Sequence, residues 1–248
     1  MKIGIIGTGA IGSTLAKKFS AAGHQVKVTN TRDMATLIEI AGKLGAKPAT
    51  MEELVDDVEV IIFSMPFKAY QNLPKHLLQK VSREVIIMDT SNYYPFRDSA
   101  LPGLEGRAES EYISETLGRP VIKVFNNLMS YTLEYKGKAA GEEGRIAISI
   151  AGDNAEHKKI AAVLVDQAGF DTVDGGSLAE SWRQEPGTPA YCTELNAAEL
   201  KQALAEAQKD KGPVARDAVM QKFQNLSSSP SHEEIVAINR TAATESLK

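Results

Sequence analysis

The residues with the clearest chemical meaning stand near the start of the chain, where Gly7, Gly9 and Gly12 form a G-x-G-x-x-G pattern. The pattern follows a short apolar run and precedes a segment with apolar residues at helical spacing. In this context the first glycine permits a tight turn, the second lets a pyrophosphate approach the backbone, and the third allows close packing of helix on strand. The amides that open the helix then face the phosphates. The sequence therefore predicts a dinucleotide cradle made of Gly7, Thr8, Gly9, Ala10, Ile11 and Gly12.

The residues that end the second predicted strand indicate which dinucleotide is bound. In such folds a carboxylate at this place accepts a hydrogen bond from the ribose 2′-hydroxyl of NAD, whereas the 2′-phosphate of NADP needs neutral donors and a cation. Asn30, Thr31 and Arg32 stand here, and all three side chains can donate to a phosphate. Asp33 follows at the expected start of a helix, which it can cap. We therefore predict NADP as the cofactor.

Three later segments end apolar runs with polar residues: SMPFKAY at 64–70, MDTSNYYP at 88–95 and IKVFNNLMSYTL at 122–133. Ligands of open α/β sheets bind outside the carboxyl ends of the parallel strands. These segments are therefore expected to hold the ribose, the carboxamide and a second substrate. The candidate residues are Ser64, Met65, Pro66, Phe67, Ser91, Asn92, Asn126, Asn127 and Leu128.

The sequence does not identify a catalytic side chain, and it offers two candidates, Lys123 and Asn126. Lys123 could donate a proton, or it could lie inside a strand with its stem buried. Asn126, like Asn127, could orient a ligand, or it could serve the turn at the strand end, which asparagine favours. Both interpretations stay open on sequence grounds.

The segment RQEPGTPA at 183–190 lies between Trp182 and Tyr191, and its prolines and glycine predict a shaped loop. It could place an aromatic wall over a second substrate, or Trp182 could belong to the core or to a dimer interface. Cys192 is expected to be an inert buried thiol, because no histidine or helix start stands beside it. The histidines lack metal-ligand spacing, and no metal site is predicted; they are His24, His76, His157 and His232.

Short runs rich in isoleucine and valine alternate with amphipathic segments from residue 2 to residue 175, which is typical of βα units in a parallel sheet. The predicted fold class is α/β: a Rossmann-type, doubly wound, mainly parallel sheet with a helical C-terminal extension. The expected strands are Lys2 to Gly7, Gln25 to Asn30, Val58 to Met65, Val85 to Thr90, Val121 to Asn126, Arg145 to Gly152 and Phe170 to Asp174, with a short extra strand at Ala46 to Pro48. The apolar residues expected to pack helices on the sheet are Leu15, Phe19, Leu37, Ile40, Leu44, Ile160, Val163 and Leu164.

The last part of the chain has a different composition. Strand signals vanish from Ser177 onward, and alanine, glutamate, lysine and leucine dominate from Leu195 to Gly212. SSSPSHEE at 227–234 predicts a loop followed by a capped helix with acidic residues in its first turn. We predict an NADP-binding Rossmann domain over residues 1–176 and a mainly helical region over 177–248 that completes the acceptor site. A homodimer contact is favoured by apolar positions that need burial, namely Leu200, Leu204, Ile235 and Ile238.

Composition narrows the possible partners. The 248 residues carry a formal net charge of −4, with lysine and arginine scattered along the chain, so no nucleic-acid partner is expected. The apolar runs are too short to span a membrane, and no membrane partner is expected. The single cysteine excludes an intrachain disulfide. We expect a cytoplasmic protein whose partner is a small-molecule acceptor.

Taken together, the GTGAIG turn, the TNTR segment and the three strand-end segments resemble the family of F420-dependent NADP oxidoreductases and their F420-independent relatives. KVFNNL at 123–128 is also similar to a segment in the cytosolic reductase domain of six-transmembrane metalloreductases. The resemblance covers roughly residues 1–205. GSLAESWRQEPGTPAYC at 176–192 resembles relatives whose acceptor is not assigned.

The resemblance implies direct hydride transfer between the nicotinamide and a flat conjugated acceptor, such as F420, FMN or FAD, without a protein acid or base. The leading hypothesis is therefore an NADPH-dependent oxidoreductase acting on a flavin or deazaflavin. One alternative is an imine or β-hydroxyacid reductase, although those families add a long helical domain for which residues 177–248 look short. Another alternative is a non-catalytic NADPH sensor.

Overall fold

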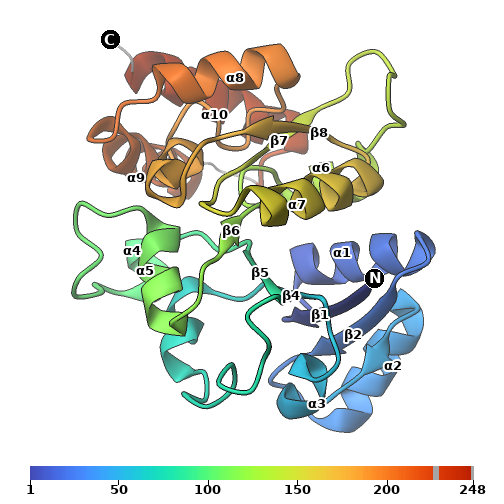
Figure 1. Cartoon of the computed structure of the whole chain (residues 1–248). Helices are drawn as coiled ribbons and strands as arrows, with labels where there is room; N and C mark the ends of the chain where they lie inside the picture. Colours follow the sequence, from blue (N-terminus) through green and yellow to red (C-terminus); the bar gives the residue numbers. More distant parts are fainter. Residues whose placement is uncertain (226–228, 247–248) are drawn as a thin grey trace.

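The computed structural model describes residues 1–225 and 229–246. Its centre is a six-stranded sheet in the order β3-β2-β1-β4-β5-β6, in which every neighbouring pair is parallel (Figure 1). The chain begins at β1, moves out to β3 and returns to β4 beside β1, which creates the switch point where such folds bind dinucleotides. The predicted Rossmann-type fold and the short extra strand are confirmed. The strands are β1 Lys2–Ile6, β2 Gln25–Thr29, β3 Lys47–Pro48, β4 Val60–Phe63, β5 Ile86–Asp89 and β6 Ile122–Lys123.

Helices connect these strands and make up most of the C-terminal part. In the sheet region they are α1 Ala10–Ala21, α2 Met34–Leu44, α3 Met51–Val55, the 3₁₀ helix η1 Phe67–Asn72, α4 Pro95–Asp98 and α5 Glu109–Leu117. Beyond β6 they are α6 Ser130–Tyr135, α7 Ala155–Ala168, the 3₁₀ helix η2 Leu178–Gln184, α8 Ala197–Glu206, α9 Lys211–Gln224 and α10 His232–Ser246.

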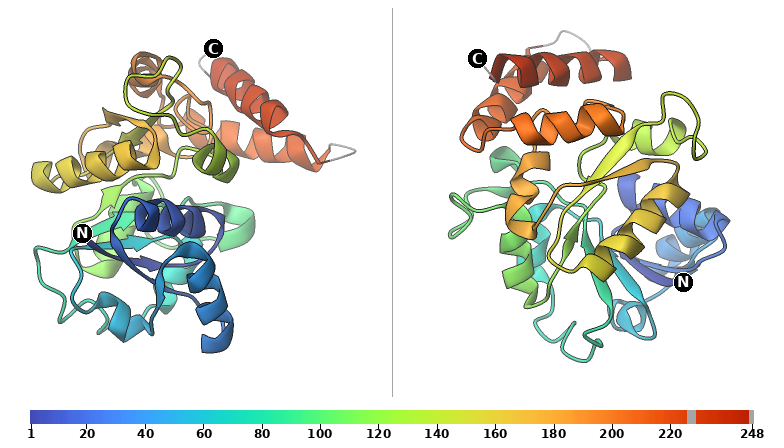
Figure 2. Two further views of the ribbon diagram at one scale, coloured as in Figure 1. Left: turned by 90° about the vertical axis from the view of Figure 1, so that its right-hand side faces the viewer. Right: turned by 45° about the horizontal axis from the view of Figure 1, so that its top comes forward.

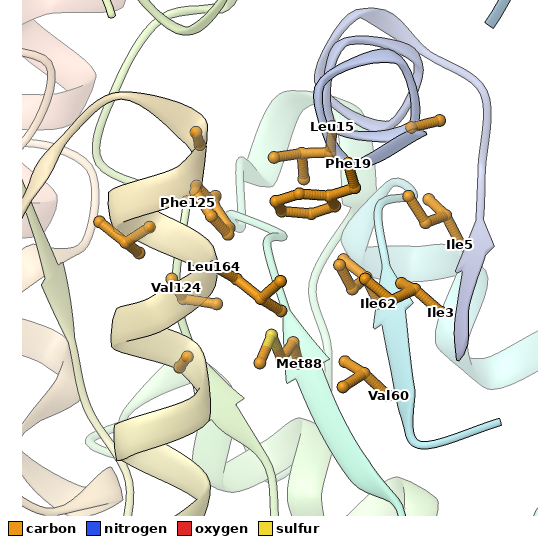
Figure 3. Packing of buried hydrophobic residues seen from close by; sticks show 14 of the residues in the cluster. Ile3, Ile5, Leu15, Phe19, Val60, Ile62, Met88, Val124, Phe125 and Leu164 are labelled. Atoms are coloured by element: carbon orange, nitrogen blue, oxygen red, sulfur yellow. The ribbon is translucent and has the colours of Figure 1, made fainter. Parts of the chain in front are cut away.

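The sheet is covered on both faces, which explains why its strands are almost continuously apolar. On one face, Ile3 and Ile62 pack with Phe19 of α1 and Leu164 of α7 (Figure 3). On the other face, alternate strand residues such as Phe63 join a separate cluster with α3 and η1. The strands β1, β4 and β5 thus contribute to both hydrophobic clusters, and the centre of the sheet is packed on both faces.

The last two strands do not join the main sheet. β7 (Ala147–Ile150) and β8 (Asp171–Asp174) pair in parallel with each other as a separate two-stranded sheet. Lys123 and Ala151 connect the two sheets through an isolated antiparallel bridge. The sequence predicted a longer strand from Val121 to Asn126, but Phe125 adopts a φ of 57°, and this left-handed conformation turns the chain after two strand residues.

In helix α7, the prediction that Val163 is buried is wrong. Val163 is 47% exposed, although the spacing placed it on the buried face. The residues that α7 buries are Ala161, Leu164, Val165 and Ala168, and this stripe follows a helical period that excludes Val163. The other predicted helix contacts lie on the buried or partly buried side.

The C-terminal helices form a layer away from the N-terminus, with α9 and α10 packed together (Figure 2). Leu200 and Leu204 of α8 are buried against β7 and β8. The predicted cap of α10 is present, because Ser231 and Glu234 exchange backbone-to-side-chain hydrogen bonds of 2.7 and 3.2 Å. Ser227 and Ser228 of the predicted loop lie outside the described residues. Over 1–225 and 229–246, no helix is long and apolar enough to cross a membrane.

Candidate functional site

The glycine turn between β1 and α1 contains three glycines with different structural roles. Gly7 has a φ of 109°, and a Cβ there would lie 2.0 Å from the Ser64 carbonyl oxygen. A Cβ on Gly12 would lie 2.0 Å from the Gly7 carbonyl oxygen. Gly9 differs, since an added Cβ would have no heavy atom within 4 Å. The fold itself therefore requires Gly7 and Gly12, whereas Gly9 faces open space.

That open space lies at the N-terminus of α1. Gly9 is the cap residue and, as a glycine, has no side chain that could cap the helix; both Gly9 and Ala10 are exposed. The first amides of an α-helix have no partner inside the helix, and they carry the positive end of its dipole. An uncapped, glycine-lined helix start fits the pyrophosphate of a dinucleotide. Thr8 and Ile11 flank this position, as the motif predicts.

Asn30 connects the end of β2 to the glycine turn. Its Nδ2 donates to the Thr8 hydroxyl at 2.6 Å, and its Oδ1 accepts from the Arg32 amide at 2.8 Å. This places the exposed side chains of Thr31 and Arg32 beside the glycine turn. Asp33 caps α2 as predicted, accepting from the Thr36 amide at 2.9 Å, so its carboxylate is engaged there. An amide, a hydroxyl and a guanidinium are thus available where the adenosine ribose of a dinucleotide would lie.

The end of β4 meets the same turn. The Ser64 carbonyl lies directly beneath Gly7, and Met65 and Pro66 follow on the surface of the sheet edge. Pro66 immediately precedes η1, which is a short 3₁₀ helix. The predicted cradle and the first strand-end segment are therefore adjacent.

The ends of β5 and β6 are connected by paired amides. Asn92 Nδ2 donates to the Asn126 carbonyl at 3.0 Å, and Asn126 Nδ2 donates to Asn92 Oδ1 at 3.0 Å. Asn126 Nδ2 also donates to the Gln184 carbonyl, and Gln184 Nε2 donates back to Asn126 Oδ1 at 2.7 Å. Both donors of Asn126 are thus used inside the protein, and its side chain is 2% exposed. Asn127 Nδ2 similarly donates to the Ala190 carbonyl.

These contacts give the two asparagines a structural role at the strand end. Gln184, which connects them to η2, was not among the predicted residues. It lies in an aperiodic segment of the sequence, and no pattern there marks it as buried.

A buried charge network lies beneath Ser91. Asp89 and Lys123 are both fully buried and lie 3.3 Å apart on neighbouring strands. Asp89 also accepts from the hydroxyls of Tyr70, Ser91 and Ser110 at 2.6 to 2.7 Å. Burial alone would raise the pKa of Asp89, but the Lys123 ammonium and these hydroxyls outweigh it and lower the pKa. Burial would lower the pKa of Lys123, but the nearby carboxylates, Asp89 first, raise it.

Sequence reasoning found Lys123 but missed its partners. The sequence feature that could have indicated a partner for Lys123 was the carboxylate of Asp89 at the end of an otherwise apolar strand.

A second pair of acidic residues borders this network. Glu185 accepts from the Glu109 amide at 2.6 Å, at the first turn of α5, and Glu109 Oε2 lies 3.6 Å from the Lys123 ammonium. Burial raises the pKa of Glu109 well above its usual value, and the Glu185 charge adds to the effect. Burial also raises the pKa of Glu185, to about 6, against the opposing effect of Lys123. Burial therefore favours the protonated form of both carboxyl groups.

Replacing Glu185 by glutamine is expected to stabilise the protein at alkaline pH. A carboxyl whose pKa is raised from 4.5 to about 6 contributes its full stability below 4.5 and loses it as pH rises through 6. At about 1.4 kcal/mol per pKa unit, the unfolding free energy of Glu185→Gln should gain about 2 kcal/mol relative to wild type between pH 4 and pH 8. Urea unfolding at several pH values measures this, with the exposed Glu115→Gln as control. A difference that does not change with pH would contradict the pKa assignment.

Aromatic side chains gather after β5. Tyr94 and Tyr191 are hydrogen bonded through their hydroxyls at 2.8 Å, and both line a cavity of about 140 Å³ with Met129 and Cys192. Burial raises the pKa of Cys192 to about 12, so the thiol stays protonated. Trp182 lies under Arg183, whose guanidinium carbon is 4.4 Å from the ring centroid, and it does not line this cavity. Of the two predicted aromatic residues, only Tyr191 contributes to the cavity.

In the described part of the chain, no group of three histidine, cysteine, aspartate or glutamate side chains is placed to hold a metal ion.

The sequence of the chain is similar to known oxidoreductases. Residues 2–93 match the family model described as NADP oxidoreductase, coenzyme F420-dependent. The putative protein YjhV of Escherichia coli (strain K12) is 40% identical over 101 residues, which cover 41% of this chain and 74% of that protein. Metalloreductase STEAP3 of Rattus norvegicus is 28% identical over 181 residues, covering 73% of this chain and 35% of that one.

A solved structure extends the likeness beyond the matched segment. The hypothetical protein SMa0349 from Sinorhizobium meliloti superposes with a TM-score of 0.65 at 28% identity, over 79% of this chain and 95% of that one. The matched sequence segment contains the glycine turn, the end of β2 and the ends of β4 and β5, which the structure brings together at one sheet edge. By sequence and by structure, the chain belongs to the family of F420-dependent NADP oxidoreductases and their relatives.

Proposed function

We propose that the protein is an NADPH-dependent oxidoreductase that transfers a hydride to a flat conjugated acceptor, a flavin or the deazaflavin F420. The observation that carries this proposal is the uncapped start of α1 at Gly9, with the donors of Asn30, Thr31 and Arg32 beside it. Membership of an NADP oxidoreductase family supports it.

The residues of the chain act by binding and orientation. The amides at the start of α1 face the pyrophosphate, and Thr31 and Arg32 bind the 2′-phosphate. Ser64 to Pro66 and Ser91 to Asn92 border the nicotinamide half of the crevice. When NADPH is bound, it supplies the hydride. No side chain has to move a proton for this step, because the conjugated ring systems carry the chemistry.

Aromatic side chains near the crevice support a flat acceptor. Tyr94 lines the small cavity with Tyr191, and Phe96, 65% exposed, lies 5.5 Å from Tyr94 between ring centroids. Such rings offer stacking surfaces to a conjugated ligand. An imine reductase would need an acid, and Lys123, the candidate from sequence, is fully buried and bound to Asp89 and Ser91.

The direct test follows NADPH absorbance with the purified protein in parallel reactions containing F420, FMN or FAD, each against a protein-free blank. Turnover with F420 alone would assign the deazaflavin, and turnover with the flavins alone would assign a flavin reductase. The absence of NADPH oxidation with all three acceptors would overturn the proposal and favour an imine or β-hydroxyacid substrate, or a sensor.

Replacing Arg32 by alanine is expected to weaken NADPH binding by about 1.5 to 3 kcal/mol, the range of a hydrogen bond to a charged group, and to leave NADH binding nearly unchanged. The reason is that the guanidinium contacts only the 2′-phosphate. Titration calorimetry with both nucleotides measures this. Lys43→Ala, which is in the last turn of α2 and also exposed, is the control. Equal losses for both nucleotides would exclude Arg32 from the 2′-phosphate site.

A further inference from the structure

We infer that Asp89 and Lys123 form a positioning pair that fixes the Ser91–Asn92 turn, and through it the nicotinamide half of the cofactor crevice. The inference rests on the proposed function, and it assigns to the buried pair a role in orienting a ligand that neither residue touches.

The pair holds Ser91 at three of its groups. Asp89 Oδ1 accepts from the Ser91 amide at 2.9 Å and from the Ser91 hydroxyl at 2.6 Å. Lys123 Nζ donates to the Ser91 carbonyl at 2.5 Å. The amide, the side chain and the carbonyl of one residue are thus bound by two oppositely charged groups. Because both groups are fully buried, water does not compete for these bonds.

The position of Ser91 determines that of Asn92. Asn92 follows directly and pairs with Asn126, whose other bonds go to Gln184. A shift of Ser91 therefore moves the ends of β5 and β6 and their connection to η2. These ends lie on the side of the switch point opposite β2, whose Asn30 lies beside the predicted adenosine site. A dinucleotide spanning the crevice places its second nucleotide over this half.

Stability alone is a weak reason for such a pair. Two buried charges that are well paired give little net stability compared with apolar residues of the same size, because each has lost its hydration. The pair does provide a fixed geometry, since Asp89 is bound by groups from η1, the turn after β5, α5 and β6. The other titratable groups that face Lys123 are Glu109 and Glu185.

The test compares two ligands that differ in the nicotinamide half. NADPH spans the whole crevice, whereas adenosine 2′,5′-bisphosphate occupies only the adenosine half. The variant is the double substitution Asp89→Asn with Lys123→Met, which removes both charges and keeps similar volumes. Ser110→Ala is the matched control, because the fully buried Ser110 hydroxyl donates to Asp89 Oδ2, whereas Ser91 is bound by Oδ1.

We expect the double variant to lose about tenfold in its preference for NADPH over adenosine 2′,5′-bisphosphate, as measured by calorimetry, because an ion-assisted hydrogen bond to the turn is removed. Ser110→Ala should keep the wild-type preference even if it melts earlier. Equal weakening of both ligands in the double variant, or an unchanged preference, would overturn the inference and leave the pair a purely structural role. Wild-type protein that binds neither ligand would instead reject the proposed function, and the inference with it.

The single variant Lys123→Met adds a second readout if it remains folded. It should show the same loss of preference, since the carbonyl of Ser91 loses its partner. Wild-type preference in a folded Lys123→Met protein would also overturn the inference.

Discussion

Replacing Gly9 by alanine should weaken NADPH binding on the order of 100-fold, about 2.7 kcal/mol, while leaving the thermal unfolding midpoint of the protein unchanged. Gly9 has φ −73° and ψ −173°, which alanine adopts without strain, and an added Cβ has no heavy atom within 4 Å. The methyl group therefore costs the folded protein nothing. It would occupy the space in which the pyrophosphate must approach the backbone.

Gly12→Ala is the contrasting variant. Its Cβ would lie 2.0 Å from the Gly7 carbonyl oxygen, so α1 and β1 would have to separate, and we expect a destabilisation of about 3 kcal/mol or more. Fluorescence titration with NADPH and a thermal melt of each variant separate the two effects. Unchanged NADPH affinity in a folded Gly9→Ala protein would exclude the glycine turn as the pyrophosphate site.

Lys123→Met should lower the unfolding free energy by about 3 to 5 kcal/mol, because removing one partner leaves the other charge buried and uncompensated. Asp89 has no exposed surface and cannot regain its hydration without opening the sheet edge. Denaturant unfolding measures the loss.

The double variant with Asp89→Asn should recover most of this loss, since the uncompensated charge is gone. The resulting double-mutant cycle gives the coupling energy of the pair. A Lys123→Met protein with wild-type stability would show that Asp89 is not ionised in the folded protein.

The central part of the fold could be predicted because its signals are local. The βα alternation follows from runs such as Ile3 to Ile6 and Val60 to Phe63, which are apolar on both faces because helices cover both faces of the sheet. The predictions of where strands end and of which helix residues are buried were less accurate. The left-handed conformation of Phe125 shortened β6, and the buried stripe of α7, from Ala161 to Ala168, leaves Val163 exposed.

The cofactor half of the site was also visible in the sequence. The roles of Gly7, Gly9 and Gly12 depend on a turn within one βα unit, and Asn30 reaches that turn from the next strand. Residues close in sequence, or on neighbouring strands, keep these distances in any chain that adopts the fold. The sequence by itself therefore determined the Rossmann-type fold, the family and the predicted NADP cradle.

Only the tertiary structure determined the buried contacts beneath the nicotinamide half of the site. Asp89 meets Ser110 and Lys123, and Asn126 meets Gln184, across 21 to 58 residues of chain. The sequence pattern does not name the partner of a lone charged residue in a strand, because that partner depends on the register with the next strand and on which helix packs over the strand end. The charges of Asp89 and Lys123 could be buried only where β5, β6, η1 and α5 meet, and that meeting is a property of the folded chain.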